Sequence, residues 1–91
     1  MNATTFDHSQ DLNTDTGLAE TRVEALFASN LQRSEQVTAE SVREAVTATV
    51  RRLGIRGCAA QVAQEFGEHP ETAVGRMRWA LGLVRQAYAL G

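Results

Sequence analysis

Apolar residues recur every three or four positions over most of the chain, and no stretch alternates between apolar and polar residues. This spacing is typical of amphipathic helices and disfavours strands. Residues 1–16 are the exception, because they are polar and acidic and follow no period, as expected of a flexible arm. We therefore predict an all-α fold, with a flexible acidic arm over residues 1–16 and a single helical domain over residues 17–91.

Helix boundary signals divide this domain into four predicted helices. Residues 14–16 offer N-cap side chains for the first helix. Its apolar stripe consists of Leu18, Val23, Leu26, Phe27 and Leu31. Thr38 is the expected N-cap of the second helix, and Gly54 is expected to end it in a left-handed conformation. After a connector over residues 55–57, a third helix is expected from about Cys58 to Phe66, and Pro70 opens the last one.

The last two predicted helices form a helix-turn-helix over residues 58–89. A short helix, a tight turn and a second helix that begins at a proline match the geometry of that motif. The small Ala63 is expected to face the helix crossing, and Gly67 to supply the positive φ of the turn. The last helix carries a long apolar seam of Ala73, Val74, Met77, Ala80, Leu81, Val84 and Tyr88.

The stretch over residues 58–86 resembles the helix-turn-helix of sigma factor region 4 and of response-regulator tails. Those families show Ala, Leu-Gly, Thr-Val, Arg-Leu and Ala at fixed offsets. The matching positions here hold Ala63, Phe66-Gly67, Thr72-Ala73, Arg76-Met77 and Ala80. The resemblance implies that the helix from Pro70 enters the major groove of DNA. The implied DNA-contacting residues are Glu71, Thr72, Gly75, Arg76 and Arg78, with Arg51, Arg52 and Arg56 at the phosphates.

Charge is divided unevenly along the chain. Residues 1–40 carry seven acidic residues and two arginines, whereas residues 41–91 carry seven arginines and four glutamates, for a net charge of −2. DNA binding therefore requires the acidic half to face away from the phosphates. Our leading hypothesis is a small transcriptional regulator that binds double-stranded DNA as a homodimer, since one such motif contacts one half-site. The first helix is then the expected dimer surface.

The alternative hypothesis is a protein-interaction module on a helix-turn-helix-like scaffold. Such an adaptor would bind a sigma factor, a polymerase or another regulator, with Trp79 as the candidate anchor. The outer face of the last helix distinguishes the two hypotheses. A continuous arginine face favours DNA, whereas interrupted charge with an exposed Trp79 favours a protein partner.

The sequence offers no pattern for catalysis. We expect no enzyme, no cofactor and no metal, because glycine-rich phosphate loops, metal-ligand clusters and paired carboxylates are missing from it. Cys58, the only cysteine, is expected to be a buried hydrophobe, and His69 a turn residue. The sequence shows neither a signal-peptide pattern nor a run of about 20 apolar residues. We therefore expect a cytoplasmic protein that has no membrane partner, and we also expect no small-molecule substrate. The use of arginine without any lysine is typical of a GC-rich bacterial genome.

Overall fold

The computed structural model describes residues 17–89, so the expected arm over residues 1–16 and the expected cap over residues 14–16 lie outside the described residues. The described part contains a first helix (residues 17–27), a connection over residues 28–38, α2 (Ala39–Glu68) and α3 (Pro70–Ala87). It contains no strand. The prediction of an all-helical fold is thus confirmed for these residues.

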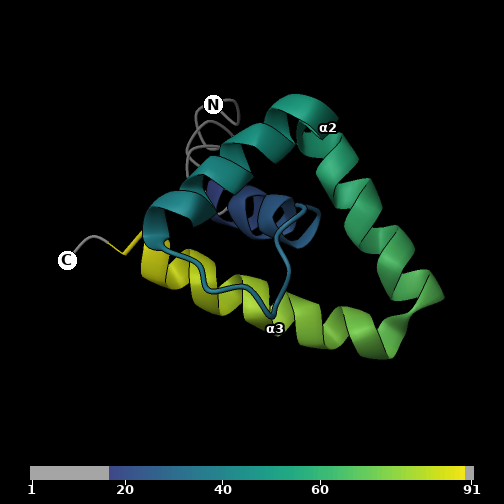
Figure 1. The fold of residues 1–91 in the computed structure, drawn as a ribbon. Helices are drawn as coiled ribbons and strands as arrows, with labels where there is room; N and C mark the ends of the chain where they lie inside the picture. The colour runs from purple at the N-terminus through teal and green to yellow at the C-terminus, as the bar shows by residue number, and fades with distance from the viewer. Residues whose placement is uncertain (1–16, 90–91) are drawn as a thin grey trace, which may run out of the picture.

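The helices are arranged as a triangle around the first helix (Figure 1). The two halves of α2 form two sides, and α3 forms the third side and returns to the beginning of α2. The first helix lies between these sides, and the connection over residues 28–38 passes along α3 before it enters α2. Each side of the triangle therefore has one face toward the first helix and one face toward solvent.

The beginning of α2 is set by a reciprocal cap. The Thr38 hydroxyl accepts a hydrogen bond from the backbone N–H of Ser41 at 3.0 Å, and the Ser41 hydroxyl accepts one from the N–H of Thr38 at 2.9 Å. Two N–H groups that have no partner inside the helix are satisfied in this way. The predicted N-cap at Thr38 is confirmed.

Gly54 bends α2 in its middle. Its backbone has φ 77° and ψ 166°, the only positive φ in the described part of the chain. This region of the map is accessible almost only to glycine. The predicted positive φ at Gly54 is thus confirmed, but its ψ is extended and not that of a left-handed helical residue, and Gly54 bends α2 without ending it. The predicted connector over residues 55–57 is wrong, because the helix resumes at once, and the count of four helices is not confirmed.

The turn between α2 and α3 is made by a single residue. We expected Gly67 to turn the chain with a positive φ, and this is wrong, since α2 continues through Gly67 to Glu68. The turn lies at His69, with φ −138° and ψ 65°. Pro70 is the first residue of α3, as predicted, and its ring disfavours helical backbone at the residue before it. The proline, and not the glycine, therefore ends α2.

The core is small and built mainly from alanine, valine and leucine. Leu26 of the first helix and Val42 and Cys58 of α2 are fully buried, and the rings of Phe27 and Phe66 stack with centroids 6.0 Å apart. The other buried apolar side chains are Ala25, Val46, Ala73, Ala80, Val84 and Ala87. These residues bring all three helices into one cluster.

Three apolar residues of the predicted helix-turn-helix lie outside the core. Ala63 is exposed and does not face a helix crossing, because the second half of α2 turns Cys58, Val62 and Phe66 inward instead. Val74 and Leu81 belong to the predicted seam of α3 but are 42% and 37% exposed. The buried stripe of α3 is narrower than its apolar stripe, and an apolar edge is left outside the core.

We expect Gly54→Ala to lower the free energy of unfolding by about 1–3 kcal/mol, because a Cβ is strained at this φ and ψ even though the space around it is open. Gly82→Ala is the matched control, since Gly82 lies in α3 with open space and no positive φ. Gly82→Ala is expected to raise the free energy of unfolding by about 1 kcal/mol, because alanine has a higher helix propensity than glycine. Urea unfolding followed by circular dichroism measures both, and equal effects would contradict the role given to Gly54.

Candidate interaction surface

Arg76, expected at DNA, is half-buried and forms hydrogen bonds within the chain. Its Nε donates to the carbonyl of Phe27 at 2.6 Å, and its Nη2 donates to the carbonyls of Ser29 and Leu31 at 3.0 and 2.9 Å. The last carbonyls of a helix have no partner within the helix, and a cation is favourable there. Arg76 thus closes the end of the first helix and ties the following turn to α3.

The surroundings of Arg76 fit this internal role. Its guanidinium stands over the rings of Trp79 and Phe27, at 4.6 and 5.8 Å from their centroids. Burial is the main reason that its pKa lies below the ordinary value, and the nearby charge of Arg33 lowers it further. Trp79 is half-buried beneath this guanidinium, so it is not the exposed anchor that the alternative hypothesis expected.

Gly75 also serves a contact within the chain. A Cβ built at Gly75 would lie 2.8 Å from Nη1 of Arg33, so the missing side chain makes room for that guanidinium. The close approach that the sequence assigned to a DNA backbone is occupied here by Arg33 of the connection. Gly75 and Arg76 are both half-buried, and each contacts its own chain.

The other residues expected at DNA are exposed but fall into two groups. Glu71, Thr72 and Arg78 lie on α3, whereas Arg51, Arg52 and Arg56 flank the bend of α2. Figure 1 shows that the bend and α3 lie on opposite sides of the first helix. Along α3 the exposed arginines are separated by the exposed Leu81, so the charge on this helix is interrupted.

An apolar groove lies between the first helix and the first half of α2. It has a volume of about 510 Å³ and follows α2 for three turns. We call it the Leu18–Ile55 groove, after the two most exposed large apolar residues, which are 49% and 59% exposed. Its lining residues are Leu18, Thr21, Arg22, Arg43, Val46, Thr47, Val50, Arg51, Ile55 and Tyr88. Three of them are arginines, and none carries a carboxylate.

Two of the three arginines are held in place by α3 and its end. The Arg22 guanidinium stacks over the ring of Tyr88, 4.1 Å from its centroid. Nη1 of Arg43 donates to the carbonyl of Ala87 at 2.7 Å, which satisfies a carbonyl in the last turn of α3. Because these side chains are already ordered, a ligand loses less side-chain entropy when it binds beside them.

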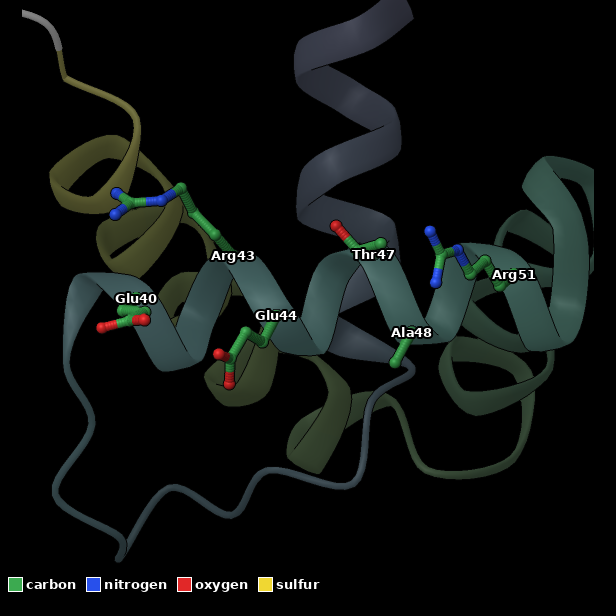
Figure 2. A pocket seen from close by; sticks show the side chains of 6 residues that line it. All are labelled: Glu40, Arg43, Glu44, Thr47, Ala48 and Arg51. Atoms are coloured by element: carbon green, nitrogen blue, oxygen red, sulfur yellow. The ribbon is translucent and has the colours of Figure 1, made fainter.

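On the outer surface of α2, positive and negative side chains lie along different edges of the helix. Figure 2 shows Arg43, Thr47 and Arg51 along one edge of the helix, and Glu44 with Ala48 along the other. The basic edge is the one that also lines the Leu18–Ile55 groove. A molecule seated in the groove therefore meets arginines and not the glutamates.

No part of the described chain suggests a metal site or a membrane span. Among the described residues, no three His, Cys, Asp or Glu side chains are grouped so that they could hold a metal ion. None of the helices described here combines the length and apolar character that crossing a bilayer requires. Cys58 is buried as predicted, and burial, followed by the charge of Glu24, raises the pKa of its thiol, which disfavours the reactive thiolate.

Sequence reasoning missed the Leu18–Ile55 groove. It placed Leu18 on the apolar stripe of the first helix and treated Ile55 as part of a connector. The partners of Ile55 across the groove come from a segment more than 30 residues away, so its setting could not be read from local pattern.

No protein-family model matches the chain, and the searches found neither a curated protein nor a solved structure similar to it. Functional inference therefore depends on the geometry described above.

We expect Arg76→Ala to lower the free energy of unfolding by about 2–3 kcal/mol, because three carbonyls lose a charged donor. Arg76→Lys should recover little of this loss, since an ammonium cannot reach the three carbonyls with a planar fork. Arg78→Ala, in the next exposed position of α3, should change the free energy by less than about 0.5 kcal/mol. Chemical unfolding of the three variants measures these changes in the free energy of unfolding. An Arg76→Ala protein as stable as Arg78→Ala would show that the three hydrogen bonds contribute nothing.

Proposed function

We propose that this chain is a protein-interaction module that binds an acidic amphipathic helix of a partner protein in the Leu18–Ile55 groove. The observation that carries the proposal is the combination of an exposed apolar floor with a rim of three arginines. Single exposed apolar residues are common on protein surfaces and need no explanation. Here two of them lie along one groove that already holds half-buried Val50 and Tyr88.

The shape of the groove favours a helical ligand. Its lining residues on α2 recur over about three turns from Arg43 to Ile55, so the groove is long enough for a helix to lie along it. Recognition of this kind places the apolar face of a helix into the groove, with anchors spaced at i, i+3 or i+4 and i+7. Covering Leu18 and Ile55 contributes roughly 25 cal/mol per Å² of apolar surface.

The charge of the rim determines the kind of partner. Arg22, Arg43 and Arg51 attract carboxylates beside the apolar anchors, and arginine is well suited to pair with them. A basic ligand would be repelled by the same three side chains. The proposal includes a regulatory partner in the cytoplasm, such as a sigma factor or polymerase subunit that offers an acidic helix.

We expect a fluorescently labelled helical peptide, with leucines every third or fourth position and glutamates beside them, to bind the protein. The same peptide with lysines in place of the glutamates should bind far more weakly. Ile55→Ser should weaken binding of the glutamate peptide by roughly 5- to 30-fold, the cost of losing one apolar anchor of about 1–2 kcal/mol. Arg51→Glu should weaken it and improve binding of the lysine peptide.

The controls are matched in type but lie outside the groove. Val74→Ser removes an exposed apolar side chain of α3, and Arg85→Glu reverses an exposed charge there. Both should leave the affinity measured by fluorescence anisotropy unchanged. Equal binding of the two peptides to the wild-type protein, or equal losses in control and groove variants, would overturn the proposal.

A second candidate function is DNA binding by a small transcriptional regulator. It is favoured by the exposure of Arg51, Arg52 and Arg56 around the bend of α2, and by the resemblance of residues 58–86 to a helix-turn-helix. With Gly75 and Arg76 engaged inside the chain, such binding would rely on phosphate contacts and on Thr72 and Arg78. It would therefore depend strongly on salt and weakly on base sequence.

The DNA candidate predicts that random duplex DNA binds at low salt and dissociates as salt rises. The variant Arg51→Ala/Arg52→Ala/Arg56→Ala should lower the slope of log K against log salt by about 2–3, and Arg78→Ala by about 1. Arg76→Ala is not a suitable probe, because it also removes a structural contact. A folded wild-type protein that does not bind duplex DNA even at low salt would exclude this candidate.

A further inference from the structure

A second apolar surface lies on the other side of the first helix. Ala19, Val23, Met77 and Leu81 form a shallow groove of about 350 Å³ between the first helix and α3. On α3 the apolar strip continues to Val74, which lies seven residues before Leu81 and thus on the same side of the helix. Val74 and Leu81 are the two apolar residues of α3 that the core leaves exposed.

This strip has an acidic border and a basic border. Glu20 and Glu24 line it from the first helix. Arg78 and Arg85 are exposed on α3, and their spacing from Val74 and Leu81 places them along the outer side of the strip. We call the whole surface the Val23–Leu81 face. Across it the chain presents two negative charges, then an apolar strip, then two positive charges.

The acidic border brings two like charges together on the first helix. Glu20 and Glu24 are four residues apart, and like charges at this spacing repel each other. Burial and the charge of Glu20 both raise the pKa of Glu24. A positive group placed against this border would relieve the repulsion.

We propose that the Val23–Leu81 face binds a second copy of this chain through a two-fold axis. A two-fold axis that runs parallel to the apolar strip places the acidic border of one copy against the basic border of the other, twice, and covers the apolar strip of both. The face is thus complementary to itself in charge and in polarity. A partner with a uniformly charged surface would match one border and be repelled by the other.

This dimer is independent of the proposed peptide site. The first helix presents Leu18, Thr21 and Arg22 to the Leu18–Ile55 groove, and Ala19, Glu20 and Val23 to the Val23–Leu81 face. The two surfaces share no residue, so a dimer leaves both grooves open. Failure of either proposal therefore leaves the other intact.

Exchange of the border charges tests the dimer. Analytical ultracentrifugation of the wild-type protein over a wide concentration range should show a dimer that dissociates on dilution. Arg78→Glu/Arg85→Glu makes both borders acidic, and Glu20→Arg/Glu24→Gln makes both borders basic. Each variant alone should be monomeric at concentrations where the wild type is dimeric.

Mixing the two variants is the decisive step. In a mixed dimer each basic border meets an acidic border, so the mixture should regain the dimer that neither variant forms alone. Loss of folding cannot produce this result, and far-ultraviolet circular dichroism checks each variant beforehand. Leu81→Ser should weaken the dimer without altering charge, and Ile55→Ser is the matched control that should not.

Several outcomes would overturn the proposal. A wild-type protein that stays monomeric at all concentrations would show that the face does not bind a second copy. Dimerisation that persists unchanged in both charge variants would place the interface elsewhere. Two folded monomeric variants that do not associate on mixing would show that the borders do not pair across a two-fold axis.

Discussion

The bend at Gly54 is the constraint on which the rest of this structure depends. A straight helix of 30 residues would be about 45 Å long, whereas the 18 residues of α3 span about 27 Å. Without the bend, the end of α3 could not return to the beginning of α2, where Arg43 binds the carbonyl of Ala87. One glycine in a conformation that other residues avoid thus closes the triangle, and the closed triangle creates the space that the first helix fills.

Arg76 joins the three parts of the chain that this bend brings together. Its planar guanidinium reaches carbonyls of the first helix and of the following connection from a position on α3. A lysine would offer a single charge without the fork that serves several acceptors at once. Three hydrogen bonds within the chain thus engage the side chain that the sequence pattern assigned to DNA. Residues 58–86 resemble a DNA-binding motif in their sequence pattern. In this structure the central arginine of that pattern, Arg76, binds carbonyls of its own chain.

The first helix divides the charged surface of the protein. One side borders a groove lined by arginines, and the other borders a strip with glutamates on one margin and arginines on the other. These two different charge patterns underlie the two partners that we propose, an acidic helix and a second copy of the chain. A dimer of this kind would present two peptide grooves, and a partner with two acidic helices would then bind with higher avidity than a partner with one.

Features that depend on neighbours within a helical turn could be predicted from the amino-acid sequence. The helical class, the cap at Thr38, the positive φ at Gly54 and the start of α3 at Pro70 follow from local backbone preferences, and all are present in the structure. Only the tertiary structure decided which side of each helix is covered. Ala63 and Leu18 are exposed and Arg76 is half-buried because the deciding contacts come from distant segments, as with the Phe27 carbonyl that Arg76 binds 49 residues away. A helical pattern indicates that an apolar side exists, but how much of it is buried depends on the angle and position of the helices that pack against it.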